Sequence, residues 1–510
     1  MKKIILLPLD ERPCNYGYPS LLPKAGYDLL LPPKEIMGNK KIPADTGAIA
    51  KWLLAHIGEA DACILSLDTL IYGGIVPSRL HHEPLETLLS RAKTVEELRR
   101  RNPRVKLYLF QLIMRCPDYS LSDEEPDYYD DCGRELHLYG RYTHLEKLGK
   151  LTEKDRSEFE KIKRKIPREA LSDFTERRRK NLSVLLHDLE YVKNGTADYF
   201  VVPQDDAAVY GFTSMDQTVV RAFFKENTLH MKTAMYPSAD DTGLSLLARA
   251  LCELDGVRPK IYVHYASSKA GGVVPWFEDR ALDETVQYHI LCVRGQRVYS
   301  LPEADIVLAV NMGSGMYRDD DPARVTGLDV ERNLAAFVSF IEYALEQGKT
   351  VAVGDVACCN GSDGELLRIL HGEDLLMRLG AYAGWNTSSN TLGTALSAAV
   401  HFLLGKDGEG RKNFLLHRYY EDMGYMAHTR AFVTENKLPA MGLDYFHADG
   451  ERGEVARFVK EELTAFMREN FPGLAVLVEN IEISMPWRRM FETDVAVIMK
   501  KGEQSEEDRS

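Results

Sequence analysis

The sequence predicts an α/β protein whose elements alternate in the manner of a (β/α)8, TIM-like barrel. Two observations lead to this prediction. Eight apolar runs of strand length carry little internal polarity, as expected for parallel strands that are covered on both faces. Helical patterns separate most of these runs from one another. An open doubly wound sheet fits the same alternation and is the alternative.

The expected strands are the runs rich in apolar, β-branched or aromatic residues, at 4–9, 62–67, 106–112, 199–203, 233–236, 260–264, 305–310 and 350–354. A further short apolar run, 28–31, is expected to be an extra strand outside the barrel. The helices expected between the strands span 46–56, 85–101, 157–192, 214–227, 244–254, 277–294 and 328–347.

The connections predict two domains. We expect a catalytic barrel over 1–404 that contains an insertion, 116–198, between its third and fourth strands. The insertion begins with acidic and tyrosine-rich sequence, and an excursion of this length is typical of a lid, a binding loop or an interaction surface. From about Gly405 the pattern changes to charged helices followed by an alternating segment, 476–499. This change predicts a small C-terminal α/β cap over 405–510.

Composition restricts the partners that we expect. The net charge of −13 argues against a nucleic acid or an anionic membrane surface. No stretch reaches the roughly 18 apolar residues of a membrane span. The eight cysteines are scattered without paired CxxC spacing, which indicates reduced thiols and a cytoplasmic location. The expected partner is a small-molecule or oligosaccharide substrate, and a homo-oligomer is left open.

Polar side chains follow almost every expected strand, where the carboxyl ends of parallel strands meet at one face. In any single case a turn or a helix cap explains such a residue equally well. Two clusters of such residues are not explained by a turn or a helix cap alone. Asp205 and Asp206 follow a strand and precede an apolar segment, and Asp10, Glu11 and Arg12 follow the buried first strand. The other candidates at or after strand ends are Asp68, Gln204, Asp240, Tyr265, Asn311, Trp385 and Asn386.

The string LPLDERPCN at 7–15 is the most specific motif of the chain. Together with Gln204-Asp205-Asp206, 240–243 and 384–395, it resembles a bacterial family classified as a domain of unknown function, over nearly the whole chain. The resemblance implies glycoside hydrolysis of N-acetylhexosaminides.

The acidic pair also resembles the Asp-Asp or Asp-Glu pair at the end of strand four in barrel hexosaminidases. Those enzymes use the substrate's own acetamido group as the nucleophile. The likeness implies that Asp205 orients the 2-acetamido nitrogen and that Asp206 protonates the leaving glycosidic oxygen. Two adjacent acids also raise each other's pKa, which suits one of them to act as a general acid.

The sequence therefore predicts a glycoside hydrolase that cleaves terminal N-acetylhexosaminides, such as β-N-acetylgalactosaminides or β-N-acetylglucosaminides, without a cofactor or a metal. Asp205 and Asp206 are the expected catalytic residues. The expected substrate-binding residues are Asp10, Glu11, Arg12, Asp68, Gln204, Asp240, Tyr265, Asn311, Trp385 and Asn386. Two alternatives stay open: a Mg²⁺- or Mn²⁺-dependent hydrolase or lyase that uses the strand-end carboxylates, and a carbohydrate-binding protein without catalysis.

Overall fold

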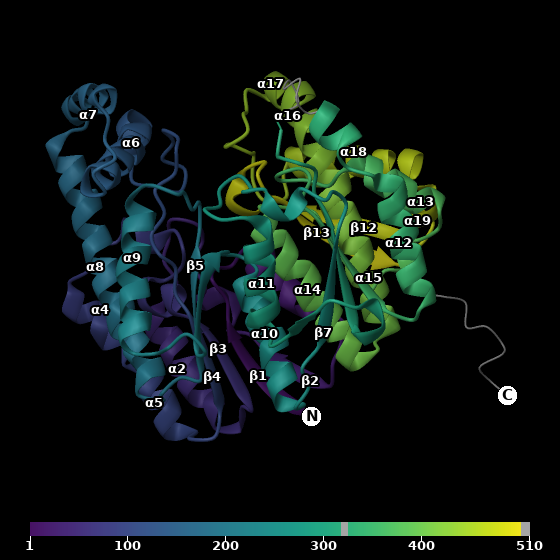
Figure 1. Ribbon diagram of the computed structural model, residues 1–510, viewed down its shortest axis with the longest axis horizontal. Coiled ribbons are helices and arrows are strands. Elements are labelled where there is room, and N and C mark those ends of the chain that lie inside the picture. Colours follow the sequence, from purple (N-terminus) through teal and green to yellow (C-terminus); the bar gives the residue numbers. More distant parts are fainter. Residues whose placement is uncertain (318–324, 501–510) are drawn as a thin grey trace.

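The computed structural model describes residues 1–317 and 325–500, and it contains two open parallel sheets (Figure 1). The first sheet has the strand order β2-β1-β3-β4-β5-β6 and the second has the order β11-β10-β9-β7-β8. The strands of the first are β1 (Lys2–Leu7), β2 (Tyr27–Leu30), β3 (Ala62–Ser66), β4 (Lys106–Phe110), β5 (Tyr199–Gln204) and β6 (Thr233–Pro237). Those of the second are β7 (Lys260–Tyr265), β8 (Gln296–Val298), β9 (Ile306–Asn311), β10 (Thr350–Asp355) and β11 (Ala381–Ala383).

The eight predicted strands all form, but they do not close into the predicted barrel. They divide between two sheets whose edge strands are β2 and β6 in the first, and β8 and β11 in the second. The run expected outside the barrel is β2, which pairs in parallel with β1. A strand covered by helices on both faces has the same apolar pattern in a barrel and in a doubly wound sheet, so the pattern could not separate the two. When the strands of each sheet are numbered by their own order along the chain, both sheets contain the spatial order 2-1-3-4-5; the second sheet is then read from β8 to β11. This order is common in doubly wound folds.

Alternate side chains of the first sheet enter two different cores. Ile5 and Leu7 face an outer core that includes residues of α2 (Thr46–His56), α4 (Leu85–Ala92), α5 (Thr94–Arg101), α8 (Arg168–Lys193) and α9 (Phe212–Glu226). Ile4 and Leu6 face a central core that includes residues of α10 (Thr242–Leu254), α11 (Leu282–Cys292) and α14 (Ser388–Gly405).

The second sheet shares that central core. Ile306 and Leu308 of β9 enter it from the other side, so α10, α11 and α14 lie between the two sheets (Figure 1). Val307 and Ala309 face a third core built with residues of α12 (Leu334–Glu346), α13 (Gly364–Gly372), α15 (Gly408–Arg418) and α18 (Glu454–Asn470). One continuous apolar core therefore joins the two halves.

The remaining elements lie around this double sandwich. The segment after β4 forms α6 (Tyr129–Lys147) and α7 (Glu153–Lys165), which lie beside α8 on the flank of the first sheet (Figure 1). The C-terminal part adds a two-stranded antiparallel sheet of β12 (Val478–Ser484) and β13 (Asp494–Met499). The short helices are α1 (Tyr18–Leu21), α3 (Pro77–Leu80), α16 (Arg430–Asn436), α17 (Leu438–Met441) and α19 (Pro472–Ala475). Across the described ranges, none of the helices has the length and apolarity that a membrane crossing requires.

Candidate active site

A network of charged groups lies at the carboxyl edge of the first sheet, where the segments after β1 and β6 meet. The Arg12 guanidinium group donates hydrogen bonds to Asp10 Oδ2 at 2.7 and 2.9 Å and to Asp240 Oδ1 at 2.6 Å. The Asn15 side-chain amide donates to one oxygen of each carboxyl group, both at 2.9 Å. Burial raises the pKa of Asp240 to about 6, although the Arg12 charge opposes the shift. These contacts fix the LPLDERPCN segment against the loop that carries Asp240.

The predicted catalytic pair follows β5 and contacts two arginines. Asp205 Oδ2 accepts hydrogen bonds from Arg79 at 2.7 Å and from Arg115 at 3.3 Å. Asp206 Oδ2 accepts one from Arg115 at 3.2 Å. Asp205 Oδ1, in contrast, makes no hydrogen bond to any residue within 1–317 and 325–500, and it can therefore accept one from a ligand.

The two carboxyl groups of the pair have different environments. The backbone of Asp206 has φ of +46°, in the left-handed region that costs a residue with a side chain about 1 kcal/mol or more. Burial, with a further contribution from the Asp205 charge, raises the pKa of Asp206 to about 7. A carboxyl group with this pKa is partly protonated near neutral pH and can act as a general acid.

The segment after β4 contributes Glu124, whose carboxyl group meets three arginines. It accepts hydrogen bonds from Arg79 at 3.0 Å, Arg115 at 3.1 Å and Arg489 at 2.7 Å. Glu124 is buried, but these three charges hold its pKa well below the usual range. The beginning of the predicted insertion is thereby attached both to the first sheet and to the C-terminal part of the chain.

The C-terminal part reaches the same place through Trp487. Its indole Nε1 donates to Glu11 Oε1 at 2.6 Å, and its ring lies 4.6 Å from the Arg12 guanidinium carbon and 4.7 Å from that of Arg489. Two cations on one indole ring are stabilised by the negative faces of the ring. Trp487 and Arg488 both have positive φ, 57° and 52°, so the chain turns sharply here. Residues separated by more than 470 positions thus form one wall.

These groups surround a cavity of about 390 Å³ between the two halves of the molecule. Five carboxyl groups and four guanidinium groups line it: Asp123, Glu124, Asp205, Asp206 and Asp240, and Arg12, Arg79, Arg115 and Arg489. The other lining residues are of three kinds: the aromatic Tyr119, Phe277, Tyr445, Phe446 and Phe491, the amides Asn360, Asn386 and Asn390, and the aliphatic or hydroxyl residues Ile75, Leu121, Ala239 and Thr387. Small-molecule sites combine apolar or aromatic side chains with placed polar groups, and this cavity carries both kinds.

Several predicted site residues lie at this cavity or directly behind it. Arg12, Asp205, Asp206, Asp240 and Asn386 line its wall. Asp10 supports Arg12, and Glu11 accepts the Trp487 bond and a backbone N–H from Lys40 at 2.8 Å.

Asp68 lies behind the cavity, in a narrow space lined also by Arg79, Arg115 and Asp205. Its Oδ2 accepts the Leu112 backbone N–H at 2.9 Å, and burial raises its pKa to about 7.

Besides Asp10, Glu11 and Asp68, four further predicted substrate-binding residues are not on the cavity wall. Gln204 accepts a hydrogen bond from Arg280 at 2.7 Å, and the Tyr265 hydroxyl donates to Asp283 at 2.6 Å. Asn311 lies at the carboxyl edge of the second sheet, where it donates to Asp355 at 2.8 Å and accepts from Arg332 at 3.1 Å. Trp385 is packed in the central core, with Nε1 3.3 Å from Thr394 Oγ1. Each of these four side chains makes at least one hydrogen bond within the protein, although the buried Gln204 Nε2 has no partner in the described part of the chain.

Sequence reasoning did not assign a role to several residues of the cavity. Arg79 and Arg489 stand in segments that resemble ordinary helix or loop sequence. Glu124 lies in the acidic start of the insertion and Asn390 in the 384–395 motif, but neither was assigned a role, and the four residues meet only in the folded chain. Besides Arg12, which was predicted, Arg115 had a local signal in the sequence, since it stands soon after the expected strand 106–112.

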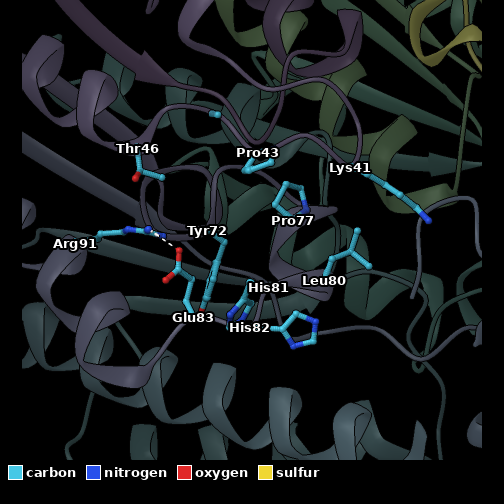
Figure 2. A pocket seen from close by; sticks show the side chains of 11 residues that line it. Lys41, Pro43, Thr46, Tyr72, Pro77, Leu80, His81, His82, Glu83 and Arg91 are labelled. Carbon is cyan, nitrogen blue, oxygen red and sulfur yellow. Dashed lines mark hydrogen bonds and ion pairs between the residues drawn. The ribbon is translucent and has the colours of Figure 1, made fainter. Parts of the chain in front are cut away.

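A second cavity, of about 550 Å³, lies beside α3 and α4 (Figure 2). Arg91 and Glu83, which line it, form an ion pair at 2.8 Å. His81 is hydrogen-bonded through Nε2 to Asn181 at 2.7 Å, and burial lowers its pKa to about 4. None of the predicted site residues lines this larger cavity. We therefore place the candidate active site in the smaller cavity, where the carboxyl groups converge.

The donor set gives little support to a metal site. Over the described ranges, no group of three or more histidine, cysteine, aspartate or glutamate side chains is arranged to hold a metal ion. At the cavity, one oxygen of Asp205, of Asp206 and of Asp240 already accepts hydrogen bonds from arginines.

Comparison with known families gives one match. The model of a family described as "Protein of unknown function (DUF4127)" matches residues 4–496. A search of curated proteins finds no match.

Proposed function

The chain belongs to the DUF4127 family of proteins of unknown function, and from its site we propose that it is a glycoside hydrolase acting on terminal N-acetylhexosaminides. The observation that carries the proposal is the Asp205–Asp206 pair on the cavity wall. One carboxyl group of the pair is held by two arginines, and burial raises the pKa of the other to about 7. Glycoside hydrolysis requires two carboxyl groups with separate roles of this kind.

In the proposed reaction, Asp206 donates its proton to the glycosidic oxygen as the bond to the anomeric carbon breaks. The acetamido oxygen of the substrate attacks that carbon from the other face and forms a cyclic intermediate. Asp205 Oδ1 accepts the acetamido N–H and orients the group. Asp206, now ionised, then takes a proton from the water molecule that opens the intermediate.

The support for this assignment differs from that expected for a barrel enzyme. The acidic pair that Asp205–Asp206 resembles stands at the end of the fourth strand of a closed barrel. The two sheets of this protein are open, so that comparison of strand positions no longer applies. The proposal rests instead on the local geometry: the unbonded Asp205 Oδ1, the elevated pKa of Asp206, and the aromatic side chains among the residues that line the cavity. Aromatic rings stack on the apolar faces of pyranose sugars.

A cytoplasmic location is also part of the proposal. The six buried cysteines, Cys14, Cys63, Cys116, Cys132, Cys252 and Cys292, form no disulfide, which is the usual state in a reducing compartment.

A panel of p-nitrophenyl N-acetylhexosaminides, with and without EDTA, tests the activity. We expect release of p-nitrophenol that EDTA does not reduce. Loss of activity with EDTA would favour the metal-dependent alternative. Sugar binding without turnover would favour the carbohydrate-binding protein.

A leaving-group series then separates the roles of the two acids. Asp206→Asn should lower kcat/KM by about two to four orders of magnitude on poor leaving groups, and much less on activated aryl groups, which need little protonation. Asp205→Asn should lower the rate on all leaving groups alike, because the acetamido group is then misaligned. Thermal melts establish that each variant is folded. A folded Asp206→Asn variant with wild-type rates on poor leaving groups would exclude Asp206 as the acid.

A further inference from the structure

The four arginines on the cavity wall are all occupied by carboxyl groups of the protein. Arg12 binds Asp10 and Asp240, and Arg489 binds Asp123 and Glu492 in addition to Glu124. Arg79 and Arg115 share Glu124, Glu125 and Asp205. An anionic ligand would have to displace these contacts and approach a surplus of carboxyl groups. The wall therefore disfavours a negatively charged ligand.

The first turn of α14 brings a different kind of group to the cavity. Asn390 is only 4% exposed, and its Oδ1 accepts the backbone N–H groups of Ala239, Asp240 and Asp241 at 3.0 to 3.4 Å. Because three donors converge on this oxygen, the orientation of the amide is determined. The amide nitrogen, with its two N–H groups, makes no hydrogen bond to any residue that the structure describes.

Asn386, which directly precedes the N-cap residue Thr387 of α14, brings a second amide to the cavity. It is 8% exposed and also lines the cavity, and its Oδ1 accepts the Thr387 N–H at 2.7 Å. Its Nδ2 likewise has no partner over 1–317 and 325–500. Two largely buried asparagines at the positive end of an 18-residue helix thus present amide N–H groups that a ligand oxygen in the cavity can accept.

An acceptor stands next to these donors. Asp240 Oδ1 is taken by Arg12 and Asn15, whereas Oδ2 has no hydrogen-bond partner in the described part of the chain. A hydroxyl group both donates and accepts, so adjacent hydroxyls of a sugar satisfy a carboxylate oxygen and an amide N–H together.

We propose that Asn386 and Asn390 donate hydrogen bonds to the oxygen atoms of an uncharged sugar and, together with Asp240, make the cavity select neutral sugars over sugar acids. This inference rests on the proposed function in taking a sugar as the ligand. It adds a substrate class and assigns Asn390 as a specificity-determining residue. Binding alone can test it, without turnover.

Calorimetric titration of the full chain with N-acetylgalactosamine, N-acetylglucosamine and glucuronic acid provides the test. The wild type should bind at least one of the two neutral sugars at least about tenfold more tightly than glucuronic acid. Asn390→Asp keeps an oxygen for the three backbone donors and replaces the amide nitrogen with a second oxygen. It should weaken binding of the neutral sugar about tenfold, with a preserved thermal melt, and Asn386→Asp should act in the same direction.

Asn194→Asp is the matched control, since Asn194 also accepts a backbone N–H, from Thr196, but lies on the surface. It should leave the dissociation constants unchanged. A folded Asn390→Asp variant with wild-type affinity overturns the inference, as does a wild type that binds glucuronic acid as tightly as the neutral sugars, or binds none of the three. Selective binding without hydrolysis supports the inference and removes the proposed function. Hydrolysis that Asn390→Asp leaves unchanged supports the proposed function and overturns the inference.

Discussion

The chemistry of the site depends on how burial acts on single carboxyl groups. Asp206 and Asp68 lie a short distance from the same arginines, and burial raises the pKa of each to about 7. Asp206 lines the cavity, whereas Asp68 lies behind it and bonds to a backbone N–H. The first pKa therefore bears on the reaction, and the second bears on the stability of the folded chain.

The Asp206 pKa predicts the shape of the pH–rate profile. A general acid must be protonated, so kcat/KM should fall about tenfold per pH unit as the pH rises through about 7. In Asp206→Asn this alkaline limb should disappear, because an amide does not titrate in this range. The measurement is kcat/KM from pH 5 to 9 on a poor leaving group. An alkaline limb retained in the variant would assign it to another residue.

The Asp68 pKa predicts a pH-dependent stability. An unfolded aspartate has a pKa near 3.9, so the folded state binds the proton more tightly. Stability from this group is fully present below about pH 4 and is lost as the pH rises through about 7. Asp68→Asn can keep the Leu112 hydrogen bond and removes this loss. The melting temperature of Asp68→Asn minus that of the wild type should therefore be a few degrees larger at pH 8 than at pH 5.

The exposed Asp127 provides the control for Asp68. Asp127→Asn should show no such change between the two pH values. A constant melting-temperature difference between Asp68→Asn and wild type would contradict the assigned pKa.

At the scale of elements, the cavity is closed by segments far apart in the sequence that are joined through ion pairs. Glu124 follows β4, Arg79 belongs to α3, and Arg489 lies between β12 and β13. Removing one partner of a buried ion-pair network leaves the other charges uncompensated, which costs about 3–5 kcal/mol.

Glu124→Gln should therefore lower the melting temperature by several degrees and raise KM, because three arginines lose their shared carboxylate. The control is Glu176→Gln on α8, where the pair with Arg179 is exposed and contributes at most about 1 kcal/mol. Thermal melts and steady-state kinetics on the same preparations measure both effects. Equal behaviour of the two variants would show that Glu124 does not hold the wall in place.

At the scale of the whole molecule, the two sheets share one central core. Val286 of α11 and Leu392 of α14 pack in the same cluster as Ile4 and Leu6 of the first sheet. A fragment of residues 1–255 keeps the first sheet but lacks α11, α14 and the second sheet. It should bind the dye ANS and melt without a cooperative transition, since of the helices on its inner face it keeps α10 and loses α11 and α14. Cooperative unfolding of this fragment would show that the first half folds alone.

The sequence by itself determined the local structure of this protein and the position of its acidic pair. Buried parallel strands produce apolar runs that can be read without a partner, and the acids after β1 and β5 stand out because they directly follow such runs. The two missed strands, β8 and β11, have three residues each, too few to form a pattern. The class, α/β with parallel strands, followed from the alternation of strands and helices.

Only the tertiary structure decided between a barrel and two open sheets, because the order of strands depends on long-range pairing that an apolar run does not encode. It also decided which candidates meet. Asp10 and Asp240 are joined by one guanidinium group, while Tyr265, Asn311 and Trp385 contact partners away from the cavity. Arg489 and Asn390 reach the site from the C-terminal part and from α14, since the helices between the sheets bring both halves to one cavity.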